Sequence, residues 1–316
     1  MYRIIIICLI SVFMFGCARK EGKKLYTIGF VQMTEDPLLD EAQKGVIDSL
    51  KEQGFVEGKN IHIDYKSAQG EISNVPLILR KFISDKVDMI ITNTTPCMVA
   101  AAGNVKDIPV VFTVAFSPEQ LKMKRPSNLT GVYDPFLMVD FVKLIKRSVP
   151  GLSTAGLPYN PSEPNASMAA EHLKQELNRQ GIELIEMPVY SSSDVLQATG
   201  TLANKKVGAM IVSADNTVYI AFGSVVKIAD ERKIPLFVTE PSQVKRGASA
   251  GVGVDFYQWG KESGELAARV IKGEKPVDIP IQPVSKMVKI LNLKAARAQG
   301  ISFSPDLIKE ADEVIQ

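Results

Sequence analysis

The chain has 316 residues, of which 46% are hydrophobic and 23% charged, a globular composition long enough for two hydrophobic cores. Its 37 basic and 35 acidic side chains give a formal net charge of +2, without the basic excess that nucleic-acid-binding proteins usually show. We therefore expect no nucleic-acid partner, whereas the charge balance excludes no small ligand.

The first 17 residues have the pattern of a secretory signal. A short basic start precedes an apolar run, 4–15, that is too short to span a membrane. The run ends in Gly16-Cys17, which resembles the lipobox of bacterial lipoproteins, although Met14 stands where that pattern prefers leucine. The resemblance implies that Cys17 is acylated and becomes the first mature residue, with 18–25 as a flexible tether. The alternatives are an ordinary signal peptide and an N-terminal anchor helix.

The cysteines allow no intrachain disulfide in the folded part. Cys8 lies in the segment that would be removed and Cys17 would carry lipid, so Cys97 alone is left. Cys97 falls in the first turn of a predicted helix, where a lowered thiol pKa is one interpretation and packing as a small apolar side chain is the other.

The segment 87–102 has the clearest pattern in the first half of the chain. Residues 87–92 are mostly apolar and rich in β-branched side chains, which predicts a strand buried on both faces of a parallel sheet. Thr95-Pro96 then predicts a helix start, because threonine is a good N-cap and proline suits the first turn. The strands expected in this half are 25–32, 61–65, 87–92 and 109–114, and the helices are 38–53, 74–86 and 96–106.

The same pattern returns in the second half. A buried-strand pattern at 206–212 is followed by the polar loop 213–217 and a helix, and 108–113 is matched by 234–239. Several elements that match in the same order indicate a duplicated βαβαβ unit and hence two similar lobes. The second copy is expected to contain helix 136–148, strand 154–158, a helix ending at Arg179, strand 182–188, helix 194–205, strand 207–213, helix 216–232 and strand 235–239. The chain then continues with strand 251–256, helix 257–272, a proline-rich link at 276–283, strand 286–291 and short helices at 294–299 and 305–315.

Polar loops follow the predicted strands in both copies, at the edge where open α/β sheets bind ligands. Two lobes that face each other across a cleft would bring these loops together; they are 33–37, 92–95, 114–118, 159–165, 213–217 and 239–242. Helix N-termini with Thr94, Thr95 and Ser162 suit a carboxylate, and Asp215 suits an ammonium group, so the loops favour a zwitterion. Helix capping is the alternative role for the two threonines and Asp215. The apolar walls could come from Phe116, Tyr133 and Tyr159, for which core packing is the alternative.

Enzyme motifs are missing from the sequence. It contains no Gly-x-Ser-x-Gly elbow, no P-loop and no His-Glu-x-x-His, and no Gly-x-Gly-x-x-Gly follows the first strand. His62 lies in an alternating strand and His172 on the outer side of an amphipathic helix, so neither indicates a metal site. We expect no enzyme activity, no cofactor and no metal.

Nine short stretches spread over nearly the whole mature chain resemble one family, the substrate-binding lipoproteins of ABC transporters that include tryptophan- and tyrosine-type binding proteins. These stretches are 28–32, 58–61, 68–70, Thr95-Pro96, 108–113, 128–132, 159–165, 215–217 and 273–276. The resemblance implies a type I periplasmic-binding-protein fold, an α/β fold with two Rossmann-like lobes, parallel sheets and three hinge crossovers near residues 131, 254 and 285. The N-lobe would comprise 26–131 plus 255–284, and the C-lobe 132–254 plus 285–316.

The resemblance further implies a monomeric, extracytoplasmic, lipid-anchored protein that traps a small molecule between its lobes and delivers it to an ABC permease. The leading ligand is an amino acid, aromatic ones included. The family has a histidine where this chain has Asp36, and often Asp-Pro where it has Ser117-Pro118. The residues expected to contact the ligand are Asp36, Thr94, Thr95, Phe116, Ser117, Tyr159, Asn160, Ser162, Asn165, Asp215, Asn216 and Asp255.

Other functions stay open at this point. The protein could be a sensory module that reports to a membrane receptor, or a binding protein for a solute other than an amino acid. A surface hydrolase on a similar scaffold is disfavoured because the sequence shows no nucleophile–base pair. A cytoplasmic repressor of this fold class is excluded by the signal sequence and by the lack of a helix-turn-helix before the first strand.

Overall fold

The computed structural model describes residues 25–316, so the signal sequence, Cys17 and nearly all of the expected tether lie outside the described residues. Within the described part, no helix is both long and apolar enough to cross a membrane. The expected lipid anchor at Cys17 stays a prediction.

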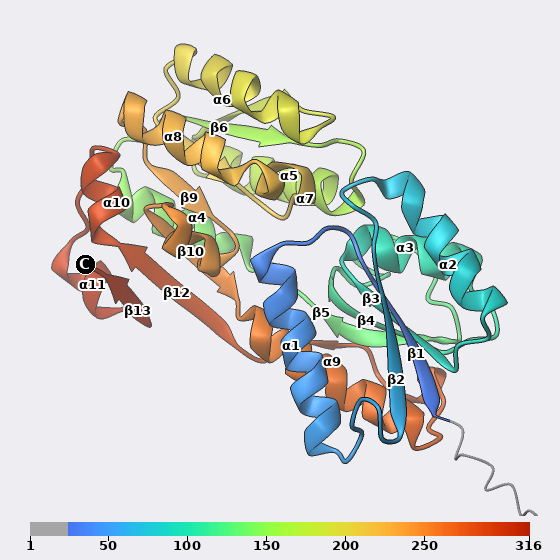
Figure 1. Cartoon of the computed structure of the whole chain (residues 1–316). Helices are drawn as coiled ribbons and strands as arrows, with labels where there is room; N and C mark the ends of the chain where they lie inside the picture. Colours follow the sequence, from blue (N-terminus) through green and yellow to red (C-terminus); the bar gives the residue numbers. More distant parts are fainter. Residues whose placement is uncertain (1–24) are drawn as a thin grey trace, which may run out of the picture.

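Two sheets, each with helices on both faces, make up the fold (Figure 1). The first sheet has the strand order β11-β5-β4-β3-β1-β2, and its strands pair in parallel. Its strands are β1 (Tyr26–Gln32), β2 (Ile61–Ser67), β3 (Met89–Asn93), β4 (Val110–Ala115), β5 (Leu129–Tyr133) and β11 (Gln282–Pro283). The helices around it are α1 (Pro37–Glu52), α2 (Val75–Ser84), α3 (Thr95–Asn104) and α9 (Phe256–Ile271), with the short 3-10 helices η1 (Ile72–Asn74) and η4 (Pro276–Asp278).

The second sheet has the order β13-β12-β10-β9-β8-β6-β7, in which β10 and β12 alone pair antiparallel. Its strands are β6 (Thr154–Tyr159), β7 (Glu183–Pro188), β8 (Ala209–Val212), β9 (Leu236–Val238), β10 (Ala250–Val254), β12 (Met287–Asn292) and β13 (Glu313–Ile315). The helices of this half are α4 (Met138–Ser148), α5 (Pro164–Arg179), α6 (Val195–Asn204), α7 (Asn216–Ile220), α8 (Phe222–Arg232), α10 (Leu293–Ala298) and α11 (Pro305–Lys309), with η2 (Ser192–Asp194) and η3 (Pro241–Arg246).

The central strands are buried on both faces, as their apolar runs predict. In β3, Met89 and Ile91 belong to one core cluster and Ile90 to another, because successive side chains point to opposite faces of the sheet. In β8, Met210 and Ile211 divide between two clusters in the same way. The two halves therefore repeat one design, which confirms the expected α/β class with two similar lobes.

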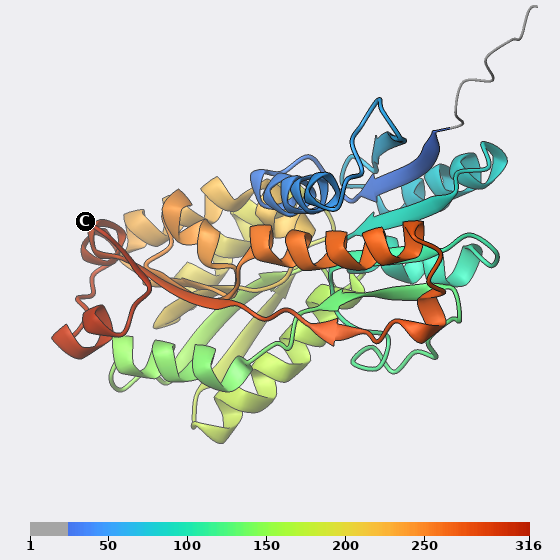
Figure 2. The ribbon, with the colours of Figure 1, turned by 90° about the horizontal axis from the view of Figure 1, so that it is seen from below.

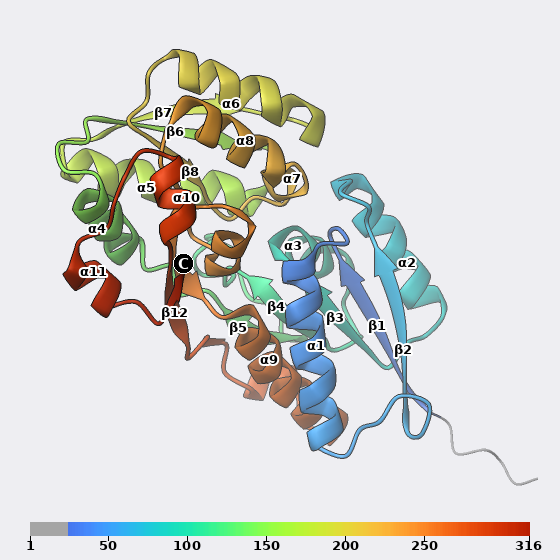
Figure 3. The ribbon, with the colours of Figure 1, turned by 60° about the vertical axis from the view of Figure 1, so that its left-hand side comes forward.

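The described chain passes between the two sheets three times, after β5, between β10 and α9, and between β11 and β12. These passages lie beside the expected crossovers near residues 131, 254 and 285. Figure 3 shows the two sheets as separate lobes, with β1 beginning at the outer end of the first lobe. The described N-terminal end is thus far from the junction between the lobes.

Helices α1 and α9 run side by side against the first sheet (Figure 2). Glycine makes this close approach possible: a Cβ atom on Gly260 would lie 1.9 Å from the carbonyl oxygen of Ala42, and one on Gly45 would lie 2.2 Å from that of Tyr257. Because α9 follows directly on β10 of the second sheet, this helix pair fixes one of the passages between the lobes.

Two expectations about helices are wrong. The segment 305–315 is not one helix: α11 ends at Lys309, and 313–315 form β13, which pairs in parallel with β12 through Ile290 and Glu313. Strand pairing with a distant segment outweighs local helix propensity here. The expected helix 216–232 is divided at Ala221 into α7 and α8.

Candidate functional site

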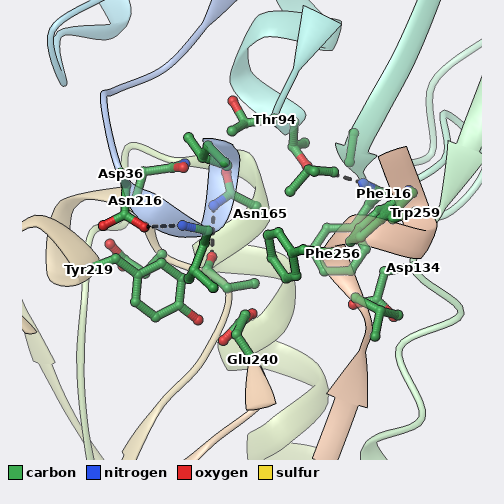
Figure 4. Close-up of a pocket in the computed structure, with 18 of the residues that line it drawn as sticks. Asp36, Thr94, Phe116, Asp134, Asn165, Asn216, Tyr219, Glu240, Phe256 and Trp259 are labelled. Carbon is green, nitrogen blue, oxygen red and sulfur yellow. Dashed lines mark hydrogen bonds between the residues drawn. The ribbon is translucent and has the colours of Figure 1, made fainter. Parts of the chain in front are cut away.

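A cavity with about 570 Å³ of empty space lies between the two lobes, at the carboxyl ends of the parallel strands (Figure 4). This figure includes open solvent at the mouth of the cavity. Loops and helix ends of both lobes line it, with Thr34, Asp36, Leu38, Leu39, Thr94, Thr95, Val114, Ala115, Phe116, Asp134, Asn165, Ala214, Asp215, Asn216, Tyr219, Glu240, Val254, Phe256 and Trp259.

The structure brings together a subset of the residues expected to contact a ligand. Those that line the cavity are Asp36, Thr94, Thr95, Phe116, Asn165, Asp215 and Asn216. Those that lie outside its lining are Ser117, Tyr159, Asn160, Ser162 and Asp255.

The residues outside have other local partners. Asn160 and Ser162 line a separate surface groove beside residues 69–73 and 190–192, and Asn160 N–H donates to Asp215 Oδ2 over 2.6 Å. Asp255 caps α9 by accepting from Gln258 N–H and also pairs with Lys286. Ser117 and Gln120 exchange hydrogen bonds in the loop after β4, and Tyr159 packs half-buried against the core of the second lobe.

Asp215 is the N-cap of α7, which was the alternative role for this residue. Its Oδ1 accepts from Val218 N–H over 2.9 Å and its Oδ2 accepts from Asn160 N–H, so both oxygens have backbone donors. Burial and the nearby Glu163 carboxyl raise the pKa of Asp215 well above its ordinary value.

The Glu163 carboxylate lies at the N-terminus of α7, where backbone N–H groups of the helix donate to it. Its side chain is fully buried and accepts from Asn216 N–H, Thr217 N–H and the Thr217 hydroxyl, with donor–acceptor distances of 2.7 to 3.1 Å. The side-chain amides of Asn165 and Asn216 donate to it as well. Because a helix N-terminus attracts anions through its free N–H groups and its dipole, the chain has filled this position with its own carboxylate.

The N-terminus of α3 faces the cavity without such a cap. Its N-cap residue Thr94 makes no side-chain capping bond, and Thr95 Oγ1 accepts instead from Phe116 N–H over 3.1 Å. Thr94 has φ 105 and Val114 has φ 49, values that β-branched residues rarely adopt and that cost about 1–3 kcal/mol each. Both strained residues are part of the cavity wall.

Aromatic side chains from separate elements supply the apolar walls. Phe116 follows β4, Tyr219 lies on α7, and Phe256 and Trp259 lie in the first turn of α9. The rings of Phe256 and Trp259 meet edge to face at 5.7 Å, and Trp259 Nε1–H donates to the carbonyl of Val132. None of Tyr219, Phe256 and Trp259 was among the expected ligand contacts, because Tyr219 and Trp259 fall within expected helices and Phe256 at the end of the expected strand 251–256.

Two buried acids in the lining were also missed. Burial raises the pKa of Asp134 to about 6, and burial together with Asp134 raises the pKa of Glu240 well above its ordinary value. Asp134 stands in the passage after β5, and Glu240 lies in the expected polar loop 239–242. An acid directly after a buried strand in the second copy was a signal that could have pointed to Glu240.

Comparison with known proteins gives one consistent result. A family model described as "ABC transporter substrate binding protein" matches residues 27–315. A tyrosine-binding protein from Clostridioides difficile is 32% identical over 318 residues, which cover 94% of this chain and 92% of the relative.

Two solved structures bear on the arrangement of the lobes. A Streptococcus pneumonia ABC domain in complex with L-Trp is 29% identical, covers 92% of this chain and 100% of that one, and superposes with a TM-score of 0.87. A ligand-free, open substrate binding protein with adhesive properties from Clostridium difficile is 32% identical, covers 92% and 99%, and gives 0.67. At similar identity the chain superposes better on the tryptophan complex than on the ligand-free, open protein.

Proposed function

From the premise that the chain belongs to the ABC transporter substrate binding protein family, which it matches over residues 27–315, we propose that it is the lipid-anchored solute-binding component of an ABC importer and that its ligand is an aromatic amino acid. Members of this family bind small-molecule substrates and are not enzymes. The fold is that of type I periplasmic binding proteins.

The observation that carries the choice of ligand is the make-up of the cavity wall. Four aromatic side chains surround a space that also exposes carboxyl groups and one uncapped helix N-terminus. An aromatic amino acid has a ring for the walls, an ammonium group for a carboxyl and a carboxylate for the helix end. One relative is a tyrosine-binding protein and another was solved with L-Trp, which supports the same class of ligand.

The carboxylate is best accommodated at the start of α3, beside Thr94 and Thr95. The corresponding position at α7 already holds Glu163, and α1 is capped by Asp36 Oδ1, which accepts from Leu38 N–H over 2.9 Å. Our proposal therefore keeps Thr95 and the backbone N–H groups of α3 as the carboxylate site and leaves out Ser162, which lies in a different groove.

Thermal unfolding of the mature protein, residues 17–316, against a panel of amino acids and sugars tests the ligand class. A ligand at 100 times its Kd adds about 2.7 kcal/mol to the free energy of unfolding. We expect a rise in Tm with tyrosine, tryptophan or phenylalanine. A rise only with solutes that are not amino acids would keep the binding role and overturn the aromatic assignment.

Anchoring and delivery need their own experiments. A labelled fatty acid should be incorporated into the full chain, and the Cys17→Ser variant should lose the label. Tyrosine uptake by cells should fall when the gene is deleted. Unchanged uptake together with an altered transcriptional response to the ligand would favour the alternative, a sensory module that reports to a membrane receptor.

The lobe limits 26–131 plus 255–284 and 132–254 plus 285–316 are part of this proposal, and sheet membership supports them. The expected monomer is also part of it. Because β1 begins at the end of the first lobe that lies away from the second lobe, a tether there would leave the cavity accessible (Figure 3).

A further inference from the structure

Asp134 and Glu240 are buried acids on the cavity wall, one in the passage between the lobes and one after β9 of the second lobe. Phe136 N–H donates to Asp134 Oδ1 over 2.6 Å, and the Thr239 hydroxyl lies 2.9 Å from Glu240 Oε2. Among the described residues, neither carboxyl has a lysine or arginine partner within ion-pair distance. Two uncompensated acids in one cavity call for a cation from outside the chain.

Two further polar atoms at the same cavity lack hydrogen-bond partners. Tyr219 Oη and Asn165 Oδ1 are unpaired, and their residues are only 8% and 6% exposed. Figure 4 shows the Tyr219 hydroxyl and the Glu240 carboxyl directed into the shared space. A carboxyl pair, an amide oxygen and a phenol oxygen are all acceptors, and an ammonium group brings three donors and no acceptor.

We propose that Glu240 and Asp134, with Tyr219 Oη and Asn165 Oδ1 as further acceptors, bind the ammonium group of the ligand, and that this binding releases a proton to solvent. The inference rests on the proposed function, since it assumes a small amine-bearing ligand in this cavity. The exchange balances: a protonated carboxyl loses its proton to water and becomes the carboxylate partner of the incoming ammonium cation. Asp215 is not the primary partner, because both its oxygens already accept backbone N–H groups.

The titratable groups that act on the pair Asp134 and Glu240 are themselves acids. Asp215 at the start of α7 adds to the rise in the pKa of Glu240, and the Glu163 carboxyl acts in turn on Asp215. On the first lobe, Asp36 is already paired with Arg246, whose Nη1 lies 3.3 Å from Asp36 Oδ2. Within residues 25–316, no histidine, lysine or arginine lines the cavity, and His172 contacts the ring of Phe136 outside that lining.

The expected pH dependence follows from the raised pKa values of the two acids. A bound cation favours their ionised forms and lowers both pKa values, so the complex holds fewer protons than the free protein. Affinity therefore rises as the pH increases from about 5 to about 8, the range over which a carboxyl with a pKa near 6 ionises. The amino acid keeps its ammonium charge throughout this range.

This site also defines the class of ligand. Tyrosine and its decarboxylated analogue tyramine both carry the ammonium group, whereas 3-(4-hydroxyphenyl)propionate has the ring and the carboxylate without it. We expect the propionate to bind at least a hundredfold more weakly than tyrosine. Tyramine should keep the proton release, because its ammonium group meets the same two acids.

Isothermal titration calorimetry of the mature protein with tyrosine, tryptophan and phenylalanine, in buffers of different ionisation enthalpy at pH 6, counts the protons directly. The wild type should release up to one proton per ligand.

Glu240→Gln keeps the shape of the side chain and should lower affinity at least tenfold with a smaller proton release and a flatter pH profile. Asp134→Asn is the second variant and should act in the same direction. Glu231→Gln, an exposed change on α8, should behave as the wild type.

The outcomes separate the two proposals. Binding of an aromatic amino acid without proton release, or with unchanged affinity in both Glu240→Gln and Asp134→Asn, overturns the inference and leaves the proposed function intact. If no aromatic amino acid binds the wild type at any pH, the proposed ligand is wrong and the inference falls with it. Circular dichroism of each variant ensures that a loss of binding is not a loss of folding.

Discussion

Arg246 Nη1 lies 3.3 Å from Asp36 Oδ2, so an ion pair joins η3 of the second lobe to the loop before α1 of the first lobe. Asp36 lines the cavity, and the Arg246 guanidinium also lies over the ring of Phe222 at 5.5 Å. The pair thus bridges the two lobes. We expect it to help hold the lobes in the arrangement seen here.

Arg246→Ala should shift the protein toward an open arrangement. Partly exposed ion pairs contribute about 0.2–1 kcal/mol, so we expect ligand affinity to fall about two- to fivefold, mainly through faster dissociation. Stopped-flow dissociation measurements would show this change. Lys245→Ala is the matched control, because Lys245 pairs with Glu313 within the second lobe. Equal effects of both variants would contradict the role of Arg246 in closure.

Trp259 should report ligand binding directly. It is the single tryptophan of the chain, it is almost fully buried, and it lines the cavity. A ligand that contacts Phe256 and Trp259 changes the surroundings of the indole, so selectively excited tryptophan emission should change with a saturable dependence on added tyrosine. Trp259→Phe should lose the signal and keep binding by calorimetry. Its free energy of unfolding should fall by about 1–3 kcal/mol, because the carbonyl of Val132 loses its buried donor.

Gly260→Ala should disturb the contact between α1 and α9. The new Cβ would lie 1.9 Å from the carbonyl oxygen of Ala42, so the helices would have to move apart, at a cost of about 1–3 kcal/mol of folding free energy. Urea denaturation measures this loss. Gly223→Ala on α8 is the control: nothing lies within 4 Å of its Cβ position, and we expect a small gain in stability.

Asp134→Asn should stabilise the ligand-free protein at neutral pH. Burial raises the pKa of Asp134 to about 6 from 3.8, so the unfolded chain loses this proton at lower pH than the folded protein does. Stability from this group is therefore present at low pH and is lost as the pH rises through 6. We expect the variant to gain up to about 3 kcal/mol on the wild type at pH 7 and much less near pH 4. A gain that is the same at both values would refute the assignment to this ionisation.

Much of the fold could be predicted from local patterns. The runs around β3 and β8, the Thr95-Pro96 helix start and the match between the two halves led to the two lobes, and the family model confirms the resemblance. The capping role of Asp215 was also foreseen as an alternative. These features depend on a few neighbouring residues, so a single sequence contains them.

The features that were missed depend on distant parts of the chain. β13 exists because it pairs with β12, and Trp259 reaches the cavity because α9 follows a passage between the lobes. The acid pair Asp134 and Glu240 joins residues that are far apart in sequence. Ser162 was expected at a carboxylate, but the end of its loop is organised by the buried Glu163.

The buried Glu163 makes the two sides of the cavity electrically unlike. The first lobe presents the open N–H end of α3, whereas the second lobe has filled the equivalent end of α7 with a carboxylate and presents acids. If the ligand is the proposed amino acid, its two charges would experience this difference as an oriented field. An amino acid that entered in reverse would set its carboxylate against the acids of the second lobe, so the proposed function predicts one preferred orientation of the ligand.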